Sequence, residues 1–257
     1  MRRAAAWLLA AALGGAGVAQ AGGLHDLADA WLVPLEQASR LLGQPSARPA
    51  TWSAGVSQGR LFGLPELPQC GLDLRWRGRV GAVEASWERL GRDLFREDTW
   101  RLAALVGGRW RGGARVGMAR LTLAGVAASP RPEVTLRLQG EMAARIDLDV
   151  WWPLTDAPSW HGSGGLRRWL RVTGGGDGWV WSAAADRSAD GTPALQGEVL
   201  VRLAPAGALG LRVEPWSGSV GLVTSWRIGG LLVRSSHLAH PDLGTCHRWG
   251  LTVERAP

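Results

Sequence analysis

Apolar and polar side chains alternate from one residue to the next along most of this chain. In the stretch 219–228 the even-numbered positions are mostly apolar and the odd-numbered positions mostly small or polar. A period of two predicts β-strands with one apolar and one polar face. The same alternation predicts strands at 50–58, 71–77, 81–90, 98–106, 114–124, 133–152, 166–173, 178–185, 196–203, 208–213, 219–228, 231–234 and 247–254.

These runs predict an all-β chain built as an antiparallel up-and-down sheet of roughly 12 strands. Turn signals such as Gly174-Gly175-Gly176-Asp177 separate neighbouring runs, as in a series of hairpins. No strand–helix repeat occurs, which argues against a parallel sheet. The apolar face could pack inside a soluble β-sandwich, or it could meet lipid around a transmembrane β-barrel with a polar lumen. Alternation alone leaves both architectures open.

The first residues favour export. Met1-Arg2-Arg3 precedes an apolar run at 4–18, and Ala19-Gln20-Ala21 supplies a small-residue cleavage site. This order predicts a signal peptide at 1–21. Loosely helical apolar spacing then predicts a short helical or plug segment at 22–48, which leaves 49–257 as the β-barrel.

Composition narrows the choice between the two architectures. All 29 basic residues are arginine, and 16 of the 18 aromatic residues are tryptophan. The net charge of +7 is scattered among acidic residues, and with the export signal this argues against nucleic-acid binding. Tryptophans near strand ends are typical of the aromatic girdles of membrane barrels. We expect five of them to face lipid or form a girdle: Trp76, Trp87, Trp152, Trp226 and Trp249.

The polar face mixes arginine with aspartate and glutamate, so a narrow barrel could be filled by ion pairs and largely closed. In a barrel this face lines the lumen. The expected lumen-facing residues are Arg75, Glu84, Glu88, Arg145, Asp147, Asp149, Arg212, Glu214, Arg227, Arg234 and Arg248.

No group of residues predicts catalysis, a cofactor or a metal site. His237, His240 and His247 cluster in sequence, but no acidic or cysteine set completes a ligand geometry. Hydrogen bonds that anchor a turn explain His240 and His247 better. We therefore expect a protein that is not an enzyme. Export makes a disulfide between Cys70 and Cys246 possible, and two unpaired cysteines fit equally well.

Three segments resemble the PorV/PorQ-type outer-membrane proteins, a FadL-like barrel group. They are the loop 62–67 (FGLPEL), the segment 90–99 (LGRDLFREDT) and the closing segment 236–248 (SHLAHPDLGTCHR). The resemblance implies an outer-membrane barrel that binds or passes hydrophobic small molecules, or that serves exported proteins as a membrane partner. It assigns a family turn motif to His240, Pro241, Leu243, Gly244, His247 and Arg248.

The sequence thus predicts an outer-membrane β-barrel in contact with outer-membrane lipid. The alternative that stays open is a secreted or periplasmic β-sandwich acting as a binding module.

Overall fold

The computed structural model describes residues 33–42, 51–143, 146–154, 168–187, 193–215 and 217–255. The predicted signal peptide and most of the predicted plug segment lie outside these residues. One helix of that segment is described, α2, at Leu35–Leu41. Within the described part of the chain, no helix is both long and apolar enough to cross a bilayer.

Strands make up most of the described chain after position 50. Their bounds are β1 Thr51–Arg60, β2 Pro68–Arg77, β3 Gly81–Arg92, β4 Phe95–Gly107, β5 Trp110–Leu123, β6 Val126–Ala127, β7 Arg131–Ala143, β8 Ile146–Pro153, β9 Arg168–Gly175, β10 Trp179–Arg187, β11 Pro193–Ala204, β12 Gly207–Glu214, β13 Ser219–Ile228, β14 Leu231–His240 and β15 Gly244–Arg255.

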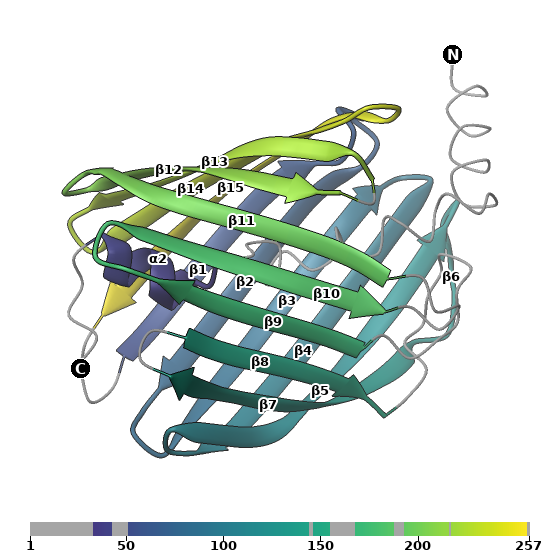
Figure 1. The fold of residues 1–257 in the computed structure, drawn as a ribbon. Coiled ribbons are helices and arrows are strands. Elements are labelled where there is room, and N and C mark those ends of the chain that lie inside the picture. Colours follow the sequence, from purple (N-terminus) through teal and green to yellow (C-terminus); the bar gives the residue numbers. More distant parts are fainter. Residues whose placement is uncertain are drawn as a thin grey trace.

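The strands close into a barrel (Figure 1). Successive strands pair antiparallel, and β1 closes the ring by pairing with β15, from Trp52 opposite Arg255 to Arg60 opposite His247. The two-residue β6 pairs only with the end of β5, so the ring in the described residues has fourteen strands. The predicted all-β, up-and-down antiparallel fold is confirmed, with fourteen strands in place of roughly twelve.

The longest predicted strand, 133–152, is two strands. β7 and β8 form a hairpin in which Leu136 lies opposite Trp152 and Leu138 opposite Val150. Directly opposed residues of an antiparallel pair share one face of the sheet. From Thr135 opposite Pro153 to Glu141 opposite Asp147, even positions lie opposite even ones and odd opposite odd. The alternation therefore keeps the same parity on both strands, and the sequence pattern hides the turn.

The alternation separates an outer from an inner face. On β13, Val220, Leu222 and Trp226 are exposed, whereas Gly221 and Val223 between them are buried. Since the ring is closed, the buried set faces the lumen and the exposed set faces outward. The interior of this protein is therefore the lumen of the barrel, and most of its large exposed apolar side chains lie on the outer wall.

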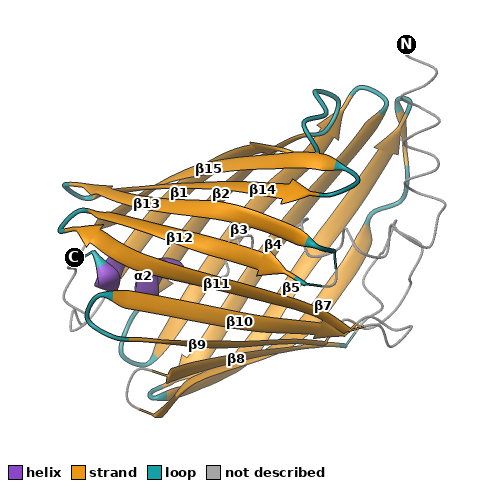
Figure 2. Cartoon of the chain, turned by 45° about the horizontal axis from the view of Figure 1, so that its top comes forward, coloured by secondary structure: helices purple, strands orange, loops and turns teal. Residues whose placement is uncertain are grey.

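The two ends of the barrel differ (Figure 2). At the terminal end, where β1 begins and β15 finishes, the connections 78–80, 108–109, 176–178, 205–206 and 229–230 have two or three residues. At the opposite end, which we call the loop end, 93–94 and 241–243 are also short, but the connection 61–67 has seven residues and the segment 124–130 contains β6. Short turns at one end and longer loops at the other are typical of outer-membrane barrels.

Candidate functional site

Arginines from eight strands face the lumen of the barrel. They alternate with exposed apolar neighbours, as Arg137 does with Leu136 and Leu138. We call this set the lumen arginine ring: Arg75, Arg101, Arg115, Arg137, Arg171, Arg212, Arg234 and Arg248, on β2, β4, β5, β7, β9, β12, β14 and β15.

Carboxylates hold the β4–β7 part of the ring. Arg101 Nε donates a hydrogen bond of 2.7 Å to Glu133 Oε1, and Arg101 Nη1 lies 3.6 Å from Glu88 Oε2. Arg137 Nη1 donates to Glu84 Oε2 at 2.9 Å. These contacts join residues of β3, β4 and β7, so they link strands that are not all neighbours in the sheet.

The β11–β14 part of the ring is held in the same way. Arg212 Nη2 donates to Glu214 Oε1 at 2.9 Å and to Gln196 Oε1 at 3.0 Å. Arg234 Nη2 donates to Glu198 Oε1 at 3.3 Å. All four charged residues of these pairs are buried, and Glu198 is only 1% exposed.

Arginine charge also accumulates in this part of the lumen. Arg75, Arg171 and Arg212 lie close enough to Arg234 to repel it, while Glu198 attracts it. Several guanidiniums converging in a region of low dielectric favour an anion, because arginine binds carboxylate and phosphate groups with paired hydrogen bonds. Among the described residues, the buried lumen side chains include the six arginines Arg111, Arg137, Arg171, Arg212, Arg234 and Arg248, and the three glutamates Glu88, Glu198 and Glu214.

Helix α2 lies inside the barrel at the terminal end (Figures 1 and 2). Its apolar side, with Ala38 and Leu41 buried, packs on lumen-facing residues of β10 to β14. Polar contacts fix it: Arg234 Nη1 donates to the Val33 carbonyl at 3.0 Å, and Ser39 Oγ donates to Glu254 Oε2 at 2.8 Å. The helix therefore covers part of the terminal opening, and the residue Val33 just before it contacts the arginine ring. The residues that complete this apolar cluster are Val33, Leu42, Val180, Leu200, Ala208, Val223 and Leu232.

A second apolar cluster fills the loop end of the lumen. Leu61 and Leu67, from the loop after β1, pack with Phe95 at the start of β4 and with Leu238 of β14. The described lumen is thus layered, with a charged middle between two apolar ends. The cluster as a whole is Leu61, Leu67, Leu90, Phe95, Leu121, Leu238 and Cys246.

The structure places most of the expected lumen-facing residues on the inner face. Arg212, Glu214, Arg234, Arg248 and Glu88 are buried there. Three others, Arg75, Glu84 and Arg227, are half-buried, and Arg227 bonds the Gly229 carbonyl in the turn at the terminal end. Arg145 and the side chains of Asp147 and Asp149 lie outside the described residues.

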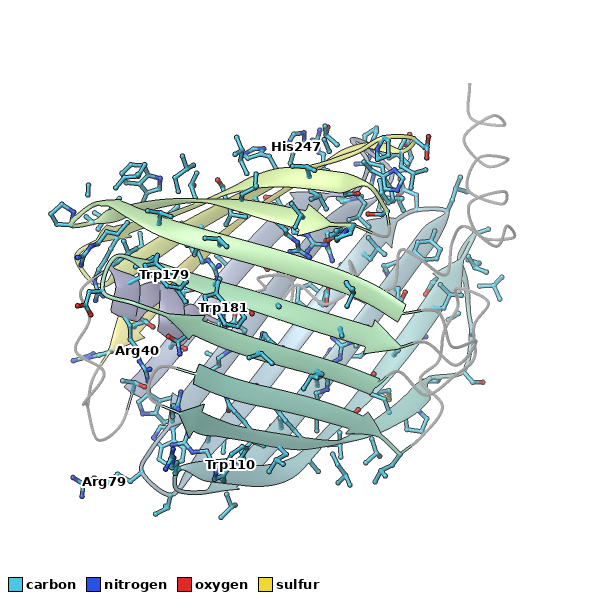
Figure 3. The ribbon with its side chains drawn as sticks, viewed as in Figure 1. Arg40, Arg79, Trp110, Trp179, Trp181 and His247 are labelled. Carbon is cyan, nitrogen blue, oxygen red and sulfur yellow. The ribbon has the colours of Figure 1, made fainter. Side chains whose placement is uncertain are left out.

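The expected girdle tryptophans lie on outward positions where they are described. Trp226 and Trp249 are 49% and 44% exposed, and Trp76 and Trp87 are half-buried on the same side of the wall. The side chain of Trp152 is outside the described residues. Figure 3 shows Trp110, Trp179 and Trp181 toward the terminal end of the wall.

The family turn motif forms the hairpin between β14 and β15. His240 Nδ1 accepts hydrogen bonds from the backbone N–H groups of Asp242 and Leu243 at 3.1 and 3.2 Å, so this imidazole anchors the turn. His237 and His247 lie on the outer surface, with their Nδ1 atoms 2.7 Å apart. No group of three metal-ligating residues occurs in the part of the chain that the structure describes.

The two cysteines do not form a disulfide. Cys246 is buried on the lumen side of β15, with its Sγ accepting a hydrogen bond from the Phe62 N–H. Cys70 shares the outward positions of Leu72 and Leu74 on β2. The barrel wall therefore separates the two thiols.

Sequence reasoning missed much of the ring. Arg101, Glu133, Arg137, Arg171 and Glu198 were not among the expected lumen residues, although all alternate with outward apolar residues. That alternation was the signal that could have found them. What it could not show is which arginine meets which carboxylate, since Arg137 and Glu84 are 53 positions apart.

No protein-family model matches this chain, and no curated protein matches it. Among solved structures, the outer membrane protein Omp33 of Acinetobacter baumannii is similar, with a TM-score of 0.51 and 8% identity over 82% of this chain and 98% of that chain. Two further structures have TM-scores of 0.43. One is KdgM porin in complex with disordered oligogalacturonate, at 9% identity over 78% of this chain and 98% of the other. The other is a mutant of the porin of Rh. blastica, at 8% identity over 80% and 99%.

The likeness to Omp33 concerns the fold alone, because the sequences share so little. Together with the closed ring of strands, it defines the class: this chain has an antiparallel up-and-down β-barrel fold like that of the outer membrane protein Omp33. The resemblance to the PorV/PorQ group stays a prediction.

Proposed function

We propose that the protein is an outer-membrane β-barrel channel whose lumen admits small polar solutes and prefers anions. The observation that carries this proposal is the lumen arginine ring, a layer of buried guanidiniums in the middle of a closed barrel. The buried side chains of this layer include six arginines and three glutamates, so positive charge is in excess among them. An excess of one sign attracts counter-ions and repels ions of like charge, and the low dielectric of the wall strengthens both effects.

The outer wall supports placement in a membrane. Large apolar side chains are exposed around it, for example Leu74 at 57%, Leu222 at 54% and Val253 at 54%. Soluble proteins seldom expose apolar surface of this extent, whereas lipid satisfies it. The longer loops would then face outward from the cell, and the short turns and α2 would face the periplasm.

The helix α2 and the two apolar clusters narrow the path. A small conductance is therefore expected in the arrangement described, with passage depending on movement of α2 or of the loop at 61–67. Residues of the ring would select the solute, while the ends would control access to it.

Ion selectivity in planar bilayers tests the proposal. Purified protein is expected to give a reversal potential in a KCl gradient that favours chloride. Arg248→Gln removes one buried charge of the ring and should lower the chloride preference by about two- to threefold. Arg255→Gln, an exposed residue at the terminal end of β15, is the matched control and should leave the preference unchanged. A cation-selective channel would contradict the assignment of the ring.

Membrane fractionation tests the placement separately. The protein should remain in the outer-membrane fraction after carbonate and urea washes and should migrate differently on gels before and after heating. Release with the soluble periplasmic proteins would instead support the secreted binding module.

A hydrophobic solute is the second candidate, and the apolar cluster at the loop end favours it. Leu61, Leu67 and Phe95 are buried together there, and an apolar molecule entering from outside would meet them once the loop at 61–67 moves. Uptake of a fluorescent fatty acid that falls on Leu67→Asp, with chloride preference unchanged, would favour this candidate. Service to exported proteins, the other role implied by the resemblance, stays a prediction.

A further inference from the structure

Four arginines stand on the outer wall of the barrel at the loop end. Arg60 ends β1, Arg89 is near the end of β3, Arg96 is near the start of β4 and Arg120 is near the end of β5. Each lies on the outward side of its strand, as Arg120 does with the exposed Met118. We call these four residues the outer arginine collar.

The collar borders a row of aromatic side chains. Arg89 is opposite Asp98 in the β3–β4 pair, and Asp98 is opposite Arg120 in the β4–β5 pair. One outward position nearer the terminal end, Trp87 is opposite Trp100. Arg89 Cζ lies 5.1 Å from the centroid of the Trp87 ring, within the range of a cation–π contact. Arginine and tryptophan side chains therefore lie next to each other on the outer wall, as they do at the headgroup level of a membrane.

The distance between the two ends of the outer face fits a bilayer. On β5, Trp110 lies at the terminal end and Arg120 at the loop end, ten residues further along the strand. With a rise of about 3.4 Å per residue and a tilt near 40°, ten residues advance roughly 25 Å along the barrel axis. The apolar band of outer-membrane barrels is about 25 Å tall. The collar therefore stands where lipid headgroups begin.

Asp98 holds two of the four guanidiniums in place. Arg89 Nε donates a hydrogen bond of 2.7 Å to Oδ1, and Arg96 Nε lies 3.0 Å from Oδ2. The Asp98 side chain is 5% exposed, whereas those of Arg89 and Arg96 are 40% and 41% exposed. Both contacts use Nε, so the Nη groups stay available to another acceptor. Arg60 and Arg120 form no ion pair within the described residues, which leaves four guanidiniums with one carboxylate.

We infer that the outer arginine collar binds the phosphate groups of an anionic glycolipid in the leaflet around the loop end. Guanidinium groups bind phosphate with paired, charge-assisted hydrogen bonds. A lipid phosphate is the occupant, because the apolar wall directly below the collar would receive its acyl chains. The collar covers only one part of the barrel circumference, because β13 carries the apolar Val220 and Leu222 at its loop end and no arginine there. This inference rests on the proposed outer-membrane placement and is independent of conduction.

Native mass spectrometry of the detergent-purified protein, titrated with diphosphoryl lipid A, tests the site. Arg60→Gln/Arg120→Gln should weaken lipid A binding at least tenfold and should fold normally, since it leaves the pairs around Asp98 intact. The matched control, Arg79→Gln/Arg109→Gln, changes two exposed residues in turns at the terminal end and should bind as the unmodified protein does. Figure 3 shows Arg79 at that end. Equal binding by the collar variant and the control would overturn the inference.

The ligand chemistry is resolved by three further titrations on the same instrument. Dephosphorylated lipid A and phosphatidylcholine should bind at least tenfold more weakly than diphosphoryl lipid A. Inorganic phosphate should not compete at millimolar concentration; full competition would show a site for free phosphate and would refute the lipid assignment. Equal binding of all the lipids would refute the role of phosphate. Because lipid binding is read in detergent, a failure to conduct ions would overturn the proposed function and leave this result standing.

Discussion

The buried pair of Arg234 and Glu198 offers a sharp test of how charge is balanced in the lumen. Arg234 Nη2 lies 3.3 Å from Glu198 Oε1, and both side chains are at most 4% exposed. Arg75, Arg171 and Arg212 repel Arg234 at the same time. The two members of the pair therefore occupy unequal surroundings, since the glutamate is attracted by several arginines and the arginine is repelled by them.

The magnitudes follow from this asymmetry. At an effective dielectric constant of about 20, opposite charges 3.3 Å apart attract by roughly 5 kcal/mol. Glu198→Gln removes that attraction and leaves the repulsion, so we expect a loss of about 3–5 kcal/mol in the free energy of unfolding. Arg234→Gln relieves the repulsion and leaves Glu198 among other arginines, so a loss of about 1–2 kcal/mol is expected. The double variant should be more stable than Glu198→Gln alone.

Urea unfolding of the protein in lipid vesicles, followed by tryptophan fluorescence, measures these free energies. The expected signature is a coupling energy of roughly 2 kcal/mol or more between the two positions in a double-mutant cycle. Equal losses for the two single variants that simply add in the double variant would refute the reasoning. Such a result would mean that the neighbouring arginines do not act on Arg234 in the folded barrel.

Three further predictions concern the helix, the wall and a turn. Ala38→Asp puts a carboxylate into the fully buried apolar side of α2 and should raise single-channel conductance in planar bilayers; an unchanged conductance would show that α2 does not cover the path. A lipid-soluble maleimide should label Cys70 faster than Cys246, and oxidation should not join the two thiols within one chain; an intramolecular disulfide on gels would contradict the wall between them. Gly91→Ala should destabilise the barrel by about 1–2 kcal/mol in urea, because Gly91 has φ of +76° and a Cβ there would strike the Phe95 carbonyl, whereas Gly112→Ala, with open space around it, should be nearly neutral.

Much of this fold can be predicted from alternation alone, because a two-residue period is a property of each strand by itself. The period assigns Arg212 and Trp226 to opposite faces before any partner strand is known. It does not count strands reliably, since the turn between β7 and β8 preserves the parity of the pattern. Closure is likewise invisible, because it depends on β1 meeting β15, nearly two hundred positions away.

The candidate site was harder to predict than the fold. Single residues such as Arg234 can be assigned to the lumen, but its partner Glu198 comes from a strand 36 positions earlier. The bond between Arg234 and the Val33 carbonyl joins residues 201 positions apart. Contacts of this kind are set by the curvature of the closed ring, which brings non-neighbouring strands together across the lumen. A linear pattern holds no information about that curvature.

The paired strands β3 and β4 carry ion pairs on both the outer and the inner face of the barrel wall. Arg89 and Asp98 are directly opposed and pair on the outer face, while Glu88 and Arg101 pair diagonally on the inner face. Slipping the two strands by one residue would exchange lipid-facing and lumen-facing side chains, which apolar alternation already forbids. A slip by two residues would preserve that alternation, and only specific partners oppose it. A two-residue slip in either direction would separate Arg89 from Asp98, and the slip that brings Arg89 opposite Arg96 would also move Glu88 away from Arg101. The outer pair therefore opposes both slips and the inner pair opposes one of them, which helps to set the register that alternation leaves undetermined.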